Sequence, residues 1–487
     1  MIFLRKCIQF LSKDSVLPLI AGLASGLYPM AFYYSKNFNF VNSWSHLYFF
    51  LATFLILPIT INYLAYFIFK NKHLSRYKTA VLPLLNALAF FILIIIAIDS
   101  RIGNKKLVLA VFLAFVVAIT CHYIKKLFPK ILTIQFILLL VVSYPLAKTI
   151  KYFIGRTDHW IEQPDHIMDV KLKTKPNIYV IQPDGYVNHK ELSKGYYQFD
   201  NSHFENWLNT QDFVLYPDMR SNYPSTMSSN SSMFAMKHHY YNQVDERGTI
   251  MNLNPLVDIL KNNNYKTHFL AEIPYLLANR PKVNFDYVNF KMREIPYLGR
   301  GFGVNKSILE DVVPLLKNQT GSNFYFFEKL QPGHISTYKK SGGSVNQEKE
   351  EYLDELQKAN EWLKELITLI LDNDTNALIV IIADHGGYVG WEYSLQSSTK
   401  TQDRDLLYSS FSTMLAIRWN DKKEAENMDM LKTSVNLFRV VLAHLSQDAS
   451  LLQNLQENGS YLRISEGAPV GLYKVLDESG EVVFEKK

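Results

Sequence analysis

The sequence predicts an α/β domain with a mostly parallel sheet, preceded by five membrane-spanning helices. Long apolar runs dominate the chain up to about Ala147, whereas the chain beyond about Arg156 has the composition of an ordinary soluble domain. In this second part, short apolar runs alternate with segments of helical periodicity, as in an open α/β sheet. We therefore expect a transmembrane domain at 1–150, a linker at 151–174 and a large second domain at 175–487.

Five apolar stretches reach or approach the length of about 20 residues that a membrane-spanning helix needs. Short charged linkers join them, which is unlike the buried helices of a soluble core. The first stretch is too long, and too closely followed by the others, to be a cleaved signal peptide. The expected spans are approximately Val16–Tyr34, Leu47–Phe69, Ala80–Ile98, Leu107–Tyr123 and Ile131–Ala147.

Charge and cysteine content limit where the second domain lies and what it binds. Lys and Arg are slightly more numerous in the loops on the N-terminal side of the membrane, which predicts a cytoplasmic N-terminus and, after five spans, an extracytoplasmic second domain. Both cysteines, Cys7 and Cys121, precede that domain, so it has no disulfide, thiolate metal site or cysteine nucleophile. The net charge of +6 includes no basic run with interleaved aromatics, so we expect no nucleic-acid partner.

The second domain contains a series of expected strands and one long expected helix. The helix, Gln347–Leu371, has apolar residues at helical spacing and an opposite face rich in Glu and Lys. Several of the strands are almost wholly apolar, as strands covered on both faces are. The expected strands are Asn177–Ile181, Phe213–Tyr216, Thr267–Ala271, Asn323–Phe327, Ala377–Ala383 and Thr413–Ile417.

Polar residues follow four of these strands. Asp184 stands in "QPDGY", His334 in "QPGHISTY", and Asp384 with His385 in "DHGG", while the Ser/Thr-rich stretch "SNYPSTMSSNSSMF" covers Ser221–Phe234. Ligands of open α/β sheets bind beyond the carboxyl ends of the strands. Carboxylates and imidazoles there could hold a divalent cation that activates a hydroxyl nucleophile.

Each of these residues also has a structural interpretation. An Asp before Gly, such as Asp184, is commonly a turn residue, and a single His, such as His334, commonly packs or faces solvent. The pair Asp384-His385 is the strongest functional signal, because two glycines let the backbone turn tightly after an apolar strand. The pair His238-His239 has no other supporting feature, and neighbouring side chains point apart on regular elements.

The order of acid, hydroxyl, His and Asp-His-Gly resembles the sulfatase-like branch of the alkaline phosphatase superfamily. "PNIYVIQPDG" is similar to its first strand and metal-binding acid, and "LIVIIADHGG" to its second metal motif. The resemblance covers roughly Lys175 to Leu445 and implies an alkaline-phosphatase-like fold. The five expected spans also look like the membrane anchors of lipoteichoic acid synthases and phosphoethanolamine transferases.

The resemblance also bears on the nucleophile. Sulfatases use a Cys or Ser in a Cys/Ser-x-Pro-x-Arg motif, which is missing from the Ser221–Phe234 stretch. That stretch is similar instead to the transferases, which present a threonine, so the resemblance implies Thr226 as nucleophile, with Ser225 as the second choice. A helix N-cap role fits either residue, and a helix N-terminus also favours binding of an anionic phosphate.

The resemblance implies that Asp184, Thr226, Asp384 and His385 hold one divalent metal ion, Zn or Mn. It implies that His334 binds the phosphate or protonates the leaving oxygen. The expected protein is then a multi-pass enzyme of the cell (inner) membrane with an extracytoplasmic catalytic domain. It would move a phospholipid head group, of phosphoethanolamine or phosphoglycerol type, through a covalent phospho-threonine to an envelope glycan or glycolipid.

Two other functions fit the same residues. With water as acceptor, the protein would be a phosphodiesterase or a sulfuric ester hydrolase. As a catalytically inactive binding module, it would bind no metal and would not respond to a change at Thr226.

Overall fold

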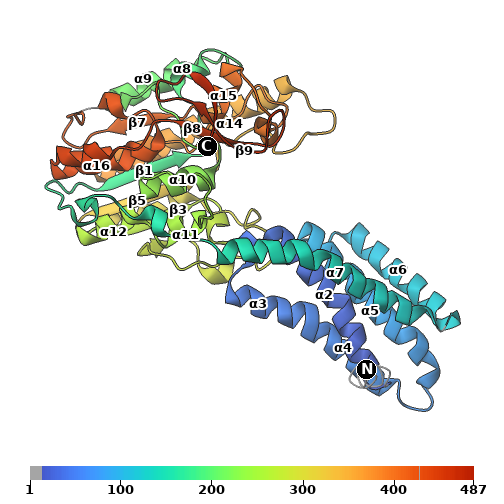
Figure 1. The fold of residues 1–487 in the computed structure, drawn as a ribbon. Helices are drawn as coiled ribbons and strands as arrows, with labels where there is room; N and C mark the ends of the chain where they lie inside the picture. Colours follow the sequence, from blue (N-terminus) through green and yellow to red (C-terminus); the bar gives the residue numbers. More distant parts are fainter. Residues whose placement is uncertain (1–13, 125, 427) are drawn as a thin grey trace. The chain divides into compact units, whose positions relative to one another are not determined.

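The computed structural model describes residues 14–124, 126–426 and 428–487, and the chain divides into two units (Figure 1). The membrane unit runs to Gly155 and includes the segments Leu277–Arg280 and Ile295–Phe302. The sheet unit comprises Arg156–Leu276, Pro281–Glu294 and Gly303–Lys487. The N-terminal basic residues and Cys7 lie outside the described residues.

The membrane unit is a bundle of helices (Figure 1). The segments α3, η1 and α4 follow one another without a break, and η1 is a stretch of π-helix. The elements are α2 (Leu17–Val41), α3 (Trp44–Phe50), η1 (Leu51–Ile56), α4 (Leu57–Ile68), α5 (Lys78–Asp99), α6 (Asn104–Tyr123) and α7 (Leu127–Ile154).

The expected count of five membrane spans is corrected to four within the described residues. The helices long and apolar enough to cross a membrane are Trp44–Ile68, Ser75–Asp99, Asn104–Tyr123 and Leu127–Ile161. The stretch expected as the first span, Val16–Tyr34, does form a helix, α2, but its glycines, prolines, serines and tyrosines dilute its apolar character.

The small residues of α2 serve packing within the bundle, since α2 contacts α4, α5 and α7. A Cβ on Gly22 would lie 2.6 Å from the Cα atom of Ile59, and one on Gly26 would lie 1.6 Å from the carbonyl oxygen of Phe54. Only glycine allows such close approach of two helix backbones, as is typical of membrane helix interfaces. The residues that lower the hydropathy of α2 are thus those that place it inside the bundle.

The sheet unit is built on a seven-stranded mixed sheet with the order β2-β7-β6-β1-β5-β3-β4. Strand β1 lies between β5 and β6 and is parallel to both, and β3 is parallel to β4 and β5. Only β7 runs antiparallel to its neighbours β2 and β6. The strands are β1 (Ile178–Pro183), β2 (Val214–Leu215), β3 (Lys266–Ala271), β4 (Tyr287–Val288), β5 (Asn323–Lys329), β6 (Leu378–Ile382) and β7 (Leu415–Arg418).

Helices cover both faces of this sheet, which confirms the expected α/β class. On one face, side chains such as Tyr179 and Phe327 join a core with α9, α13 and the long helix α14, which was expected at Gln347–Leu371. On the other face, Phe326 packs against Phe234 of α10, with ring centroids 5.0 Å apart. The helices are α8 (His189–Leu192), α9 (Ser202–Thr210), α10 (Thr226–Ala235), α11 (Glu246–Met251), α12 (Pro255–Asn262), α13 (Ile308–Lys317), α14 (Val345–Asn373), α15 (Arg404–Phe411) and α16 (Leu437–Ser446).

A second, three-stranded antiparallel sheet closes the C-terminal part of the sheet unit. Its order is β10-β9-β8, and its strands are β8 (Ser460–Ile464), β9 (Gly471–Leu476) and β10 (Val482–Lys486). It packs against α15 through Leu407 and Phe411. The sequence analysis did not predict this sheet, because its strands are short and mix polar with apolar residues.

Candidate active site

The sheet brings four of the candidate residues to one edge. Asp184 follows β1 directly, and Asp384 and His385 follow the neighbouring strand β6. His334 stands on the loop that leaves β5, the other neighbour of β1. These strands are parallel, so their carboxyl ends meet at this edge.

Asp184, Asp384 and His385 form a cluster that could hold a metal ion, with one ligand atom from each lying within 4.8 Å of the others. His385 Nε2 lies 3.3 Å from Asp384 Oδ2 and 3.5 Å from Asp184 Oδ1. Two carboxylates and one imidazole are hard and borderline donors of the kind that divalent cations take.

The hydrogen bonds of the cluster leave these same atoms free for a cation. His385 Nδ1 donates to the carbonyl oxygen of Gly386 at 2.9 Å, so in the neutral ring Nε2 carries the lone pair. Asp384 Oδ1 accepts from the Gly185 amide at 3.0 Å. Among the described residues, neither Asp184 Oδ1 nor Asp384 Oδ2 has a hydrogen-bond partner, although both are buried. Buried carboxylate oxygens without partners are costly, and a divalent cation would satisfy both.

Thr226 is the first residue of α10, and its hydroxyl faces the cluster. Thr226 Oγ1 lies 3.5 Å from His385 Nε2. The residue at the N-cap position is Ser225, but its hydroxyl bonds Ser228 Oγ at 3.0 Å rather than a backbone amide of the first turn. The site-facing hydroxyl is thus that of Thr226, and it stands at a helix N-terminus, which favours a bound anion.

His334 lies beside the cluster rather than within it. Its ring centroid is 5.8 Å from that of His385 and 5.8 Å from that of Tyr388. Burial, and then the nearby charge of His385, lower the pKa of His334. A neutral imidazole at this distance could accept or return a proton.

Tyr388 is a site residue that the sequence analysis missed. Its hydroxyl donates to the carbonyl oxygen of Pro224, two residues before Thr226, and its ring packs edge-on against His385. It therefore ties the loop after β6 to the turn that presents Thr226. The sequence feature that could have identified it is its position, one residue after "DHGG".

The pKa values of two ionisable groups in the metal-free cluster are shifted from their usual values. Burial, and then the negative charge of Asp384, raise the pKa of Asp184 to about 7. Burial lowers the pKa of His385, but the charges of Asp384 and Asp184 outweigh it and leave this pKa above its usual value. Negative charge contributes to both shifts, and a bound cation would neutralise it.

The metal-free protein should therefore lose stability as the pH rises. Asp184 keeps its proton to about pH 7 in the folded chain but only to its usual value of 3.8 when unfolded. A raised folded-state pKa stabilises the protein at low pH, and this contribution falls as the pH passes through the window between those values. We expect EDTA-treated protein to unfold at a lower temperature at about pH 8 than at about pH 5.5. Asp184→Asn should reduce this difference by raising Tm at the higher pH; an unchanged pH dependence in the variant would contradict the assignment.

The loops after β1 and β5 touch at two glycines. Gly185 has a φ of +68°, and a Cβ there would lie 2.0 Å from the carbonyl oxygen of Gly333. The Gly333 amide donates to the carbonyl oxygen of Asp184 at 2.8 Å. This contact fixes the backbone that carries Asp184. It also fixes the amide of Gly185, which donates a hydrogen bond to Asp384.

Gly185→Ala is expected to destabilise the protein by about 3 kcal/mol or more, because a left-handed penalty of 1–2 kcal/mol adds to overpacking of 1–3 kcal/mol. The matched control is Gly321→Ala, because Gly321 has a φ of +69° but nothing within 4 Å of its Cβ position. Denaturant unfolding of both variants checks this. Equal losses of unfolding free energy in the two variants would show that the contact with Gly333 is unimportant.

His238 and His239 do not join the site. His238 Nε2 donates to the carbonyl oxygen of Glu457 at 2.8 Å, and His239 Nε2 donates to that of Ser228 at 3.0 Å. Both rings are buried and stack with tyrosines. They are packing residues of the sheet unit.

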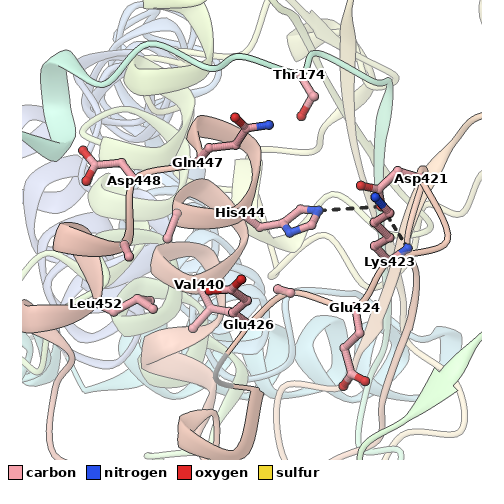
Figure 2. A pocket seen from close by; sticks show the side chains of 13 residues that line it. Thr174, Asp421, Lys423, Glu424, Glu426, Val440, His444, Gln447, Asp448 and Leu452 are labelled. Atoms are coloured by element: carbon pink, nitrogen blue, oxygen red, sulfur yellow. Dashed lines mark hydrogen bonds and ion pairs between the residues drawn. The ribbon is translucent and has the colours of Figure 1, made fainter.

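A cavity of about 400 Å³ lies at the opposite edge of the sheet, next to the residues that precede β1 and follow β7. Figure 2 shows His444 of α16 directed toward Asp421 across this cavity. The two side chains are 3.8 Å apart and both are partly exposed. The cavity contains none of the candidate site residues.

The mostly parallel sheet, with carboxylates, an imidazole and a hydroxyl at one edge, agrees with the expected alkaline phosphatase superfamily. The sulfatase family model matches residues 186–447, which is more than half of the chain and includes Thr226, His334, Asp384 and His385. The chain belongs to the sulfatase family and is an enzyme of that superfamily. Its membrane unit adds helices that suit an integral membrane protein.

Solved structures also resemble the chain. Lipooligosaccharide phosphoethanolamine transferase A from Neisseria meningitidis, an integral membrane protein, is 12% identical with a TM-score of 0.42, covering 89% of this chain and 96% of that one. The periplasmic domain of EptC from Escherichia coli in complex with Zn is 11% identical with a TM-score of 0.43, covering 64% and 95%. A phosphonate monoester hydrolase of Agrobacterium radiobacter is 11% identical with a TM-score of 0.37, covering 56% and 74%. A comparison with curated proteins finds no match.

Proposed function

We propose that this protein is a metal-dependent membrane transferase. It moves a phospholipid head group, of phosphoethanolamine or phosphoglycerol type, through a phospho-threonine to an envelope glycan or glycolipid. The observation that carries this proposal is the Thr226 hydroxyl at a helix N-terminus, 3.5 Å from His385 Nε2. Beside it are two carboxylate oxygens that have no hydrogen-bond partner among the described residues.

The proposed ligands of one divalent ion, Zn or Mn, are Asp184, Thr226, Asp384 and His385. When bound, this cation would lower the pKa of the Thr226 hydroxyl and neutralise charge on the phosphoryl group. Carboxylates and imidazole suit either metal, because both ions accept oxygen and nitrogen donors. The Gly185 amide and the Gly386 carbonyl orient Asp384 and His385 for this role.

In the first half-reaction, Thr226 Oγ1 loses its proton and forms a bond to phosphorus. The bond from phosphorus to the glycerol oxygen breaks, and the diacylglycerol leaves as an alcohol after taking up a proton. In the second half-reaction, a hydroxyl of the acceptor gives up its proton, bonds to phosphorus and restores Thr226. His334 would take the proton of Thr226 and pass it to the glycerol oxygen in the first half-reaction. In the second it would take the proton of the acceptor and return it to Thr226 Oγ1, since its lowered pKa keeps the ring neutral and able to accept one.

The membrane unit supports a lipid donor. Four helices of the described residues can cross a bilayer, so the chain resides where phospholipids are concentrated. We propose that the protein lies in the cell (inner) membrane with the sheet unit on the extracytoplasmic side, where envelope glycans are modified.

The test is the mass of the full-length protein after incubation with Zn or Mn and phospholipid vesicles that contain phosphatidylethanolamine. We expect a mass increment that peptide mapping places on Thr226, and the increment identifies the group carried. Head group released into solution without an adduct would favour hydrolysis, with water as acceptor. Absence of both metal and product would overturn the catalytic function and leave a binding module.

A further inference from the structure

The membrane unit contains a cavity of about 320 Å³ lined by α2, α3 and α7. Its wall is largely apolar and includes Met30, Phe38, Leu47 and Leu146. The volume is at the lower end of the range of about 300–1,000 Å³ for small-molecule sites. We propose that it binds one acyl chain of a membrane phospholipid, together with the ester group that begins the chain.

One hydroxyl in this cavity calls for a polar partner. Tyr34 lines the cavity and is 8% exposed, and its hydroxyl has no hydrogen-bond partner among the described residues. A buried hydroxyl without a partner destabilises the protein, so the site favours a ligand that supplies an acceptor. The carbonyl oxygen of a lipid ester, at the head of an apolar chain, supplies one.

The remaining lining gives the cavity a polar end. Asn42 and Ser43 line it, and Trp44 beside them is 74% exposed. An exposed Trp at the end of a membrane span is typical of the level of the lipid head groups. The Asn42 side chain accepts a hydrogen bond of 3.1 Å from Asn279 of the same unit, and the next residue, Arg280, stacks on Tyr297. A cation near this end complements a lipid phosphate.

A phospholipid is the occupant that the surroundings favour. The cavity lies among helices whose outer side chains are exposed and apolar, such as Leu140 of α7, which is 72% exposed. Bilayer lipids are the molecules that meet such a surface, and a phospholipid combines the apolar chain, the ester acceptor and the anionic head group. That this lipid is the donor rests on the function proposed above.

The test measures the rise in Tm of full-length protein in detergent as dioleoyl phosphatidylethanolamine is added. Leu146→Trp fills the cavity and is expected to abolish the saturable rise. Tyr34→Phe removes one hydroxyl that bonds no described residue, so it should keep or raise the lipid-free Tm and bind the lipid up to about tenfold more weakly. The control is Leu140→Trp, the same change on the lipid-facing side of α7, which should behave as wild type.

Each outcome decides the proposal. Equal lipid responses in wild type, Tyr34→Phe and Leu146→Trp would overturn it and show that only surface lipid stabilises the protein. A response that follows protein concentration instead of lipid would assign the cavity to a second copy of the chain and also overturn it. Thr226→Ala should keep the lipid response, so loss of the phospho-threonine and loss of this site are distinguished.

Discussion

Thr226→Ala should lose the proposed transferase activity by about 10⁴-fold or more, since removing a catalytic nucleophile can cost about 10⁶ in kcat. The variant lacks the hydroxyl that lies 3.5 Å from His385 Nε2. Thr226→Ser keeps a hydroxyl at the same helix position and should retain measurable activity. The activity of both variants is measured as the release of labelled head group from phospholipid vesicles in the presence of acceptor.

Ser225→Ala is the matched control, because Ser225 is the neighbouring hydroxyl and the second choice for the nucleophile. Its Oγ bonds Ser228, so the alanine variant should lose one hydrogen bond and little activity. If Ser225→Ala were inactive and Thr226→Ala active, the nucleophile would be Ser225. Full activity in both variants would end the phospho-enzyme proposal.

Asp384→Asn should weaken metal binding by at least about 100-fold, because even the outer partners of metal ligands commonly contribute 10–100-fold. The asparagine oxygen can still accept from the Gly185 amide, whereas its NH₂ group replaces Asp384 Oδ2 and repels a cation. The metal-free variant should be as stable as wild type or more so, since one of two buried, mutually repelling carboxylates is gone. Metal titration and thermal unfolding with and without EDTA measure the two effects.

The control for this variant is Asp421→Asn at the opposite edge of the sheet. Asp421 is 3.8 Å from His444 and partly exposed, so its loss should cost about 1 kcal/mol or less and leave metal affinity unchanged. A wild-type metal affinity in Asp384→Asn would remove Asp384 from the ligand set.

The strands that carry the candidate site could be predicted because they are short apolar runs. Strands β1 and β6 are buried along their whole length, so their sequences contrast sharply with the polar residues that follow. The position of Asp184, Asp384 and His385 at one edge then follows from parallel pairing alone. The metal and catalytic roles of these residues stay predictions.

Other features of the structure could not be predicted, because no local pattern in the sequence indicates them. The serines of α10 look solvent-exposed in the sequence, but Ser228, Ser229, Ser231 and Ser232 are buried and bonded within the sheet unit. The contact of Gly185 with Gly333 joins two loops far apart in the chain, which no periodicity encodes. The expected first span, Val16–Tyr34, was counted because the sequence does not show that the small residues of α2 pack inside the bundle.

The order of strands in the sheet has a consequence for assembly of the proposed metal site. Gly185 and Asp384 are hydrogen-bonded although 199 residues separate them, because the neighbouring strands β1 and β6 are the first and sixth of the described strands in chain order. Such non-local pairing forms late and folds slowly. An incomplete chain therefore offers no assembled set of the proposed ligands, and a cation would be captured only after the sheet is whole. If the proposed metal site is correct, the metal supply of the compartment where folding finishes would decide which ion the enzyme carries.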